Sequence, residues 1–291
     1  MSLFAIVLIV AAAFIHASWN YLAKRAGGSA PFVWLFAALS ALFYAPITFY
    51  VVLTQNISLD STQLIFIAGS GVLHMFYFVV LQRGYRVGDL SLVYPLARGT
   101  GPALSTTAAI LFLGERPSLV ALGGAGLVIV GVFLLTWSAT YSRDPRAARK
   151  NRAIAVAYGL VTGTIIAGYT LWDKQAVSAQ MISPIVLDYF SSLARMILLM
   201  PIALGQWSEV QREWREHRRE VIGVAMLTPL AYILVLTAMI TTPVSYVAPA
   251  RELSILIGAA MGTQLLAEGD ARRRLTAAGA IVAGVIALAV G

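Results

Sequence analysis

Ten mainly apolar stretches of about 20 residues follow one another along the chain, and each is long enough to cross a hydrocarbon core of roughly 30 Å as a helix. Hydrophobic residues make up 59% of the chain and charged residues 12%, against about a quarter charged in an ordinary soluble domain. A bilayer must therefore be the solvent. The sequence predicts an all-α membrane protein with ten transmembrane helices, over 3–23, 31–53, 63–82, 90–113, 118–138, 153–172, 184–205, 220–240, 244–266 and 274–290.

The polar connections between these stretches are too short to form a soluble domain, since the longest are 142–152 and 208–220. No basic residue precedes the first stretch, so we expect a retained helix and not a cleavable signal peptide. The chain has no cysteine, which excludes disulfides and thiolate chemistry. It also has no glycine-rich phosphate loop for ATP hydrolysis. We expect no metal, no cofactor and no enzymatic activity.

The basic residues are distributed asymmetrically between the two membrane faces. Sixteen of the 21 Lys and Arg residues lie in odd-numbered connections, and only Arg116 and Lys174 lie in even-numbered ones. Under the positive-inside rule, this places both termini on the non-cytoplasmic side of a bacterial inner membrane. The net charge of +8 then reflects topology. Because no aromatic platform is interleaved with these charges, we expect no nucleic-acid partner.

The two halves of the chain share a spaced pattern. An offset of 153 residues relates "LGERPSLVALGGAGLVIVGV" to "AEGDARRRLTAAGAIVAGVI" through three pairs: Glu115 and Glu268, Gly126 and Gly279, and Gly131 and Gly284. The same offset relates "YPLARG" to "VAPARE" through Arg98 and Arg251. An offset of 150 relates Trp19 to Tyr169 and Lys24 to Lys174. The sequence thus predicts two five-helix repeats, 1–140 and 153–291, joined by the basic loop 141–152. Five helices per repeat force the second copy into inverted topology, which is typical of secondary transporters.

These features resemble the EamA family of the drug/metabolite transporter superfamily. The resemblance rests on "LGERPS", on the aromatic-rich first helix that ends in Lys, and on the glycine-rich fifth and tenth helices. The nearest comparison is with the amino-acid exporters of the YddG type. The resemblance implies ten helices and export of amino acids or other metabolites. One departure is the connection "TQNISLDSTQ", which has no basic residue.

Ionisable residues inside membrane segments are costly and usually face a cavity or a partner. Arg98 and Arg251 each follow a proline, Pro95 or Pro249, which we predict to be hinges because proline removes a helical N–H and frees a carbonyl. A guanidinium offers paired donors to a carboxylate or phosphate, so both arginines are candidates for substrate binding. The alternative is that they pair within the protein, and Glu252 is one such partner for another helix.

Several aromatic and polar side chains share helical faces at i, i+3 and i+4 spacing, as a cavity for an amphipathic solute would require. Together with the two arginines and Glu252, the predicted substrate-binding residues are His16, Trp19, Asn20, His74, Tyr77, Tyr94, Tyr169, Trp172 and Tyr246. The sixth segment offers Tyr169, Trp172 and Asp173 on such a face, although Asp173 is not among the predicted substrate-binding residues. Either His16 or His74 is also a candidate for proton coupling.

Four further residues are candidates for coupling or gating. Asp188 and Arg195 lie seven residues apart on one helical face; Asp188 is a candidate proton carrier, although it also lies where a carboxylate stabilises a helix start. Glu115 and Glu268 end the fourth and ninth segments, on opposite membrane faces, as structural caps or gate elements. We further expect eight glycines to permit close helix packing, at 123, 124, 126, 131, 159, 163, 279 and 284.

The sequence favours a secondary active transporter that exports small amphipathic metabolites, amino acids first among them, by alternating access around a central cavity. The alternatives are a flippase or intramembrane enzyme acting on phosphorylated or lipid-linked substrates, and a passive channel. The expected partners are a small-molecule substrate and the bilayer, with possible proton coupling. We expect a monomer or weak dimer.

Overall fold

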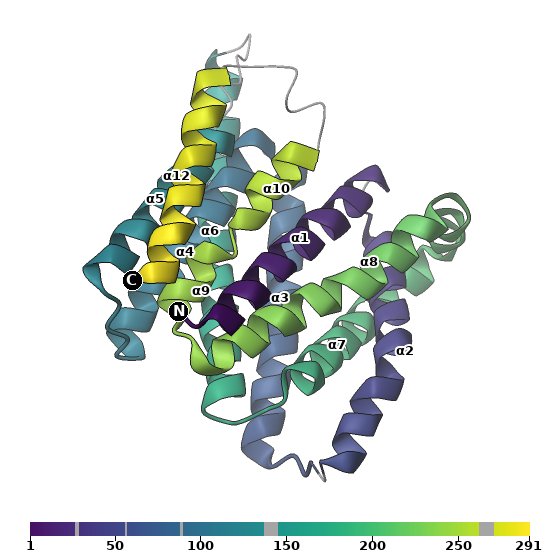
Figure 1. Ribbon diagram of the computed structural model, residues 1–291. Coiled ribbons are helices and arrows are strands. Elements are labelled where there is room, and N and C mark those ends of the chain that lie inside the picture. Colours follow the sequence, from purple (N-terminus) through teal and green to yellow (C-terminus); the bar gives the residue numbers. More distant parts are fainter. Residues whose placement is uncertain (27–28, 56, 88–89, 137–144, 262–270) are drawn as a thin grey trace.

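The computed structural model describes residues 1–26, 29–55, 57–87, 90–136, 145–261 and 271–291, and all regular structure within these ranges is helical (Figure 1). This confirms the all-α fold. The helices are α1 (Leu3–Arg25), α2 (Ala30–Thr54), α3 (Ser61–Val87), α4 (Leu90–Phe112), α5 (Leu119–Thr136), α6 (Pro145–Ser178), α7 (Pro184–Gly205), α8 (Trp207–Thr241), α9 (Val244–Ala250), α10 (Leu253–Met261) and α12 (Ala271–Val290).

Six helices in the described part of the chain, α1, α2, α3, α6, α7 and α8, are long and apolar enough to span a membrane. Shorter apolar stretches of α5 and α12 cover 119–134 and 275–290. Large apolar side chains project from the outside of the bundle, including Phe112 (80% exposed) and Leu119 (86% exposed). Such a surface is stable only against lipid or a partner. The chain is therefore an integral membrane protein.

Several predicted helix boundaries were wrong. Helix α3 continues to Val87 and not to residue 82, and α6 runs from Pro145 to Ser178 and not from 153 to 172, so residues 145–152 of the predicted basic loop are helical. The eighth helix begins at Trp207 and not at residue 220, because the arginine-rich segment is itself helical and is joined to the rest of α8 by a kink at His217. The ninth predicted helix is broken into α9 and α10. Pro249 has no N–H to continue the helix, and the chain passes through short i to i+3 hydrogen bonds at Arg251 and Glu252 before α10 begins. Residues 262–266 of that prediction lie outside the described residues.

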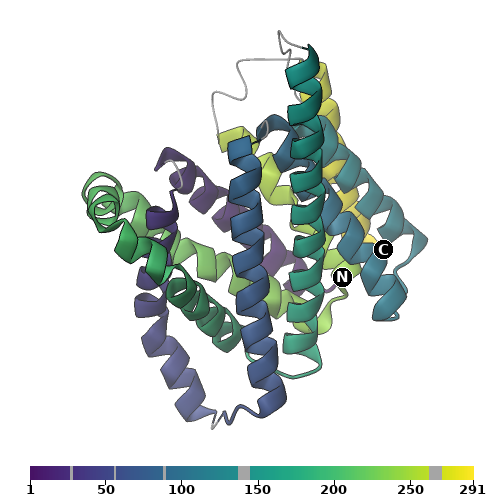
Figure 2. The ribbon, with the colours of Figure 1, turned by 180° about the vertical axis from the view of Figure 1, so that it is seen from behind.

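The helices of the two predicted halves pack against each other in matching pairs. Counting α9 and α10 together as the ninth helix and α12 as the tenth, we can exchange each helix with the one five places away. The exchange relates three pairs of contacts that are all present in the structure. It relates α4 with α6 to α1 with α10, α1 with α8 to α3 with α6, and α2 with α8 to α3 with α7. The pairs α5 with α12 and α2 with α7 map onto themselves. Figure 2 shows α3 beside α6, and Figure 1 shows α5 beside α12.

The contact between α5 and α12 repeats this relation at the level of single residues. A Cβ added at Gly131 would meet Ile281 Cγ1 at 2.7 Å and the Ala277 carbonyl oxygen at 2.9 Å. A Cβ added at Gly284 would meet Val128 Cγ2 at 2.7 Å and the Gly124 carbonyl oxygen at 2.6 Å. Each set becomes the other under the offset of 153 residues. The two helices therefore approach closely at equivalent positions.

Five of the eight predicted packing glycines, at 124, 131, 159, 163 and 284, lie where a Cβ would come within 3.0 Å of a neighbouring helix. The prediction was wrong for Gly123, Gly126 and Gly279, where a Cβ would have no atom within 4 Å. These three positions face away from the helix contact, because the period of 3.6 residues per turn places only some of the glycines on the packed side.

The two chain ends lie together. The terminal amino group of Met1 donates a hydrogen bond of 3.1 Å to the carbonyl oxygen of Ala289, and both ends appear near one another in the ribbon (Figure 1). The connection before α5 and the turn between α8 and α9 lie beside Met1. The N-terminus, the C-terminus and two of the even-numbered connections thus share one face of the bundle.

Candidate functional site

Arg98 and Glu252 form an ion pair inside the helix bundle. Arg98 Nη2 of α4 lies 3.0 Å from Glu252 Oε2, which follows α9, and 3.4 Å from the Ser254 hydroxyl of α10. Arg98 is 7% exposed and Glu252 is 1% exposed. A buried charge needs a partner, so this pair explains how both residues are accommodated. It shows that Arg98 pairs within the protein, one of the two alternatives left open by the sequence.

Arg251 lies next to this pair and is also buried. It takes part in no ion pair within 4 Å among the described residues, and its Nε has no hydrogen-bond partner there. Its charge acts on Tyr169, Glu252, Arg98 and Tyr232, which surround it. Arg251 is therefore a buried cation with hydrogen-bonding capacity left over, which a bound anionic group would satisfy.

The two predicted hinges differ in the structure. Helix α9 ends one residue after Pro249, and Arg251 lies in the turn that follows. Helix α4 continues without interruption through Pro95, whose side chain lies outside the described part of the chain. The broken helix presents Arg251 and Glu252 from a turn, whereas Arg98 projects from a continuous helix.

Aromatic rings and histidine gather beside the arginines. The His74 ring lies 4.3 Å from the Tyr169 ring and 5.3 Å from the Tyr232 ring, centroid to centroid, and the Tyr77 ring lies 5.7 Å from that of Tyr169. His74 Nδ1 is 2.9 Å from the carbonyl oxygen of Ser70, which fixes the ring. Tyr77, His74 and Tyr169 were predicted from the sequence, and the structure brings them together from α3 and α6.

The polar face of α1 reaches the same cluster. His16 lies within electrostatic range of Arg98 and Arg251, and its ring is 4.8 Å from that of Trp19. Trp19 Nε1 is buried and has no hydrogen-bond partner in the described part of the chain. Asn20 Nδ2 donates to the carbonyl oxygen of His16 at 2.8 Å, so its amide stabilises α1.

Asp188 and Arg195 of α7 lie within electrostatic range of the aromatic cluster. Asp188 is 7% exposed, and its charge and that of Arg195 act on each other. Arg195 also acts on Tyr77, Tyr169 and Tyr232. The helical face that carries Asp188 and Arg195 thus points toward the same interior region as Arg98 and Arg251. Ser191 lies between Asp188 and Arg195 in the sequence, and its hydroxyl donates to Ser70 at 3.0 Å.

Three predicted site residues lie elsewhere. Trp172 Nε1 donates to the carbonyl oxygen of Phe66 at 2.8 Å, so this ring fixes α6 against α3. The Tyr246 hydroxyl accepts from the Ser118 amide at 3.3 Å, near the chain ends. Glu115 accepts from the amides of Val244 (2.7 Å) and Ser245 (2.9 Å) and so caps the start of α9. The side chain of Tyr94, and Glu268, lie outside the described residues.

The predicted site residues lack two members of the cluster, Tyr232 and Asp173, although Asp173 was placed on the same face as Tyr169 and Trp172. The Tyr232 hydroxyl of α8 donates to Asp173 Oδ2 at 2.5 Å, and His74 Nε2 lies 3.8 Å from the same oxygen. The sixth segment was predicted to end at 172, whereas α6 continues to Ser178. Asp173 therefore fell one residue outside the set of membrane-embedded charges. Tyr232 gave no signal beyond being a tyrosine in an apolar segment.

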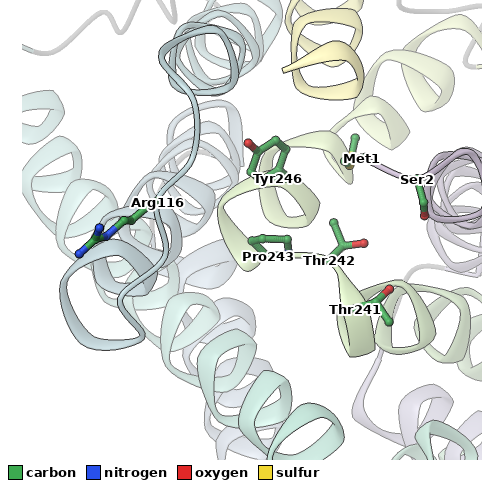
Figure 3. Close-up of a pocket in the computed structure, with 7 residues that line it drawn as sticks. All are labelled: Met1, Ser2, Arg116, Thr241, Thr242, Pro243 and Tyr246. Carbon is green, nitrogen blue, oxygen red and sulfur yellow. The ribbon is translucent and has the colours of Figure 1, made fainter.

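A separate open pocket of about 380 Å³ lies near the chain ends (Figure 3). Its lining consists of Met1, Ser2, Arg116, Thr241, Thr242, Pro243 and Tyr246. Nearby, Lys174 Nζ donates to the carbonyl oxygens of Met239 (2.5 Å) and Thr242 (3.2 Å) and so caps the end of α8. With Glu115 capping α9, the turn between α8 and α9 is held from both sides.

Residues 3–137 match the sequence model of the EamA-like transporter family. Residues 3–137 therefore belong to this family. The family lies within the drug/metabolite transporter superfamily, which supports a transporter role for the chain, and the resemblance inferred from "LGERPS" and the glycine-rich helices is confirmed. Members of the EamA family are transporters and not enzymes.

The fold of the chain is similar to that of a solved structure described only as a crystal structure of protein. The two share 14% sequence identity and a TM-score of 0.76, over 98% of this chain and 96% of the other. At that identity the likeness concerns the fold alone. No curated protein is significantly similar in sequence.

Proposed function

We propose that the chain is a secondary active transporter that exports small amphipathic metabolites, amino acids first among them, across a bacterial inner membrane by alternating access. The observation that carries this proposal is the buried cationic cluster of Arg98 and Arg251 with Glu252, at the interior contact of α4 with the turn after α9. Charged groups inside a membrane bundle mark substrate or ion pathways. The YddG-type comparison supports amino acids as the solute.

The chemistry of the cluster matches a solute with one carboxylate and an apolar part. Arg251 has a hydrogen-bonding nitrogen without a partner among the described residues, which suits a carboxylate oxygen. Tyr169, Tyr77 and His74 offer aromatic faces to an apolar or cationic portion. Arg98 is held by Glu252, so we assign Arg251 the direct contact and Arg98 a positioning role.

The matched helix pairs support alternating access. Two five-helix repeats of opposite orientation allow the bundle to adopt two related arrangements, each open to one side of the membrane. The exchange of α4·α6 with α1·α10, and the reciprocal glycine contacts of α5 and α12, are what such repeats would produce. Arg98 and Arg251 occupy equivalent positions of these repeats, since the offset of 153 residues relates them.

Counterflow in proteoliposomes tests the proposal. Vesicles that hold the purified protein are preloaded with one unlabelled solute and then given its labelled form, for a panel of amino acids and of phosphorylated metabolites. We expect saturable counterflow with an amino acid and its loss in Arg251→Ala, with Arg116→Ala as the exposed control. Counterflow with phosphorylated solutes alone would favour the flippase-type alternative, because two arginines also suit a phosphate. Unsaturable flux would indicate a channel.

A further inference from the structure

We propose that Asp173 is the residue that binds and releases the proton through which solute movement is coupled to the proton gradient. This inference rests on the proposed transport function. Asp173 is fully buried (0% exposed), close to the end of a helix that spans the membrane, and belongs to none of the contacts assigned to the solute.

The Asp173 carboxylate forms no ion pair with a Lys or Arg in the described part of the chain. Its Oδ2 accepts a hydrogen bond from Tyr232 at 2.5 Å and lies 3.8 Å from His74 Nε2. No Lys or Arg of the described residues lies within 4 Å of it. Its neighbour Lys174 turns away and binds the carbonyl oxygens that end α8. A buried carboxylate without a permanent counter-charge is stable when it holds a proton and costly when it does not.

Glu252 provides the contrast within the same bundle. It is equally buried, but it has Arg98 at 3.0 Å, so its charge is compensated in place. Asp188 is another interior aspartate, and Arg195 of its own helix acts on it, although the two form no ion pair within 4 Å. Of these three buried carboxylates, Asp173 is the one whose nearest partners, a tyrosine hydroxyl and an imidazole, are able to exchange protons.

Tyr232 of α8, Ser70 of α3 and Arg251 after α9 act on Asp173, and Asp173 in turn acts on Asp188 of α7. The other charged or titratable groups on α6 and on the helices packed around it are His74 of α3, Arg98 of α4 (which pairs with Glu252), Arg195 of α7, and Tyr169 and Lys174 of α6 itself. Arg251 exerts its effect on Asp173 without an ion pair between the two. The solute-binding cation and the proposed proton site are therefore adjacent but separate.

A path toward Asp173 is also present. His74 lies against the carboxylate, the Ser70 hydroxyl of the same helix follows one turn away, and Ser191 of α7 donates to Ser70 at 3.0 Å. A proton that reaches His74 Nε2 is passed to Asp173 Oδ2, and the imidazole returns to its neutral form. On release, the carboxylate gives the same proton back, so no other reactant is required.

Two transport assays distinguish proton coupling from solute binding. Proteoliposomes with the wild-type protein are given a pH difference of either sign and assayed for net movement of the labelled solute, while counterflow is measured at equal pH on both sides. In Asp173→Asn, we expect net movement driven by the pH difference to fall to the level of protein-free vesicles. Counterflow, which needs no net proton transfer, falls far less. Asp60→Asn, an exposed aspartate outside the helices, should behave as wild type.

Tyr232→Phe provides a second variant that keeps the carboxylate. It removes the donor that stabilises the ionised aspartate, so gradient-driven transport should persist with its half-maximal pH moved upward. If Asp173→Asn does not fold, this variant alone decides. An unchanged pH profile in Tyr232→Phe would overturn the proposal. So would loss of coupling in Asp188→Asn while Asp173→Asn remains coupled.

The failure of the transport function gives a different result. If the wild-type protein shows no counterflow with any solute, the proposed function is wrong. If it shows counterflow that no pH difference can drive into net movement, transport stands and the role of Asp173 does not.

Discussion

Arg98 and Glu252 are a buried pair, and such a pair responds differently to the loss of one member and to the loss of both. Removing one partner leaves the other buried without its ion-pair partner, whereas replacing both with apolar side chains is close to neutral. We expect Arg98→Met to lower the free energy of unfolding by about 3–5 kcal/mol. The double variant Arg98→Met/Glu252→Leu should recover most of this loss.

Unfolding of the purified protein in detergent, followed by circular dichroism against denaturant concentration, measures both variants. Arg116→Met serves as the control, because its side chain is exposed. If the double variant is as unstable as Arg98→Met, the pair does not stabilise the fold in the way its geometry indicates.

Single residues also mark the limit of what the sequence could predict. Arg98 and Arg251 were found because charges in apolar segments are rare and because the offset of 153 relates them. Their different environments were not predictable, since Glu252 approaches Arg98 only through the packing of α4 against the turn after α9. Asp173 was missed because a helix end cannot be placed within one residue from hydropathy.

Close helix contact depends on which side of a helix its glycines face. We expect Gly131→Ala and Gly284→Ala to destabilise the protein by about 1–3 kcal/mol each, because the added methyl groups meet carbonyl oxygens at 2.9 and 2.6 Å. The controls Gly126→Ala and Gly279→Ala lie on the same two helices and have open space around them. They should be neutral or stabilising by up to about 1 kcal/mol, from helix propensity.

Thermal unfolding of the four variants, measured in one detergent, tests this prediction. Equal effects at all four positions would contradict the register of α5 against α12. The offset of 153 residues in the sequence predicted that Gly131 and Gly284 are equivalent. It could not distinguish the packed glycines from the outward ones, because both kinds share the offset.

Elements that contain a break were the least predictable from the sequence. Pro95 and Pro249 are one residue out of register under the offset of 153, and α4 is continuous whereas α9 ends after Pro249. Proline weakens a helix at both sites, and the surrounding contacts decide whether the helix divides. Apolar length alone therefore predicted one helix over 244–266 where the structure has α9 and α10.

At the scale of the whole molecule, the distribution of Lys and Arg predicts which face is cytoplasmic. The chain has no cysteine, so a single introduced cysteine can be labelled without background. We expect Arg116→Cys to react with a membrane-impermeant maleimide in intact cells, because that residue lies near the chain ends on the predicted outer face. Arg215→Cys, on the arginine-rich part of α8, should react only in inverted vesicles. The reverse pattern would overturn the predicted orientation and with it the direction of transport.

The central claim is that Arg251 recognises the carboxylate of a small amphipathic solute in the interior of the bundle. Competition in the counterflow assay tests it most directly, with an amino acid and its carboxamide as the two competitors. We predict that the amino acid competes and the carboxamide does not, and that Arg251→Ala loses most of its affinity for the amino acid, whereas Arg116→Ala does not. If the carboxamide competes as well as the amino acid in the wild-type protein, carboxylate recognition by Arg251 is wrong.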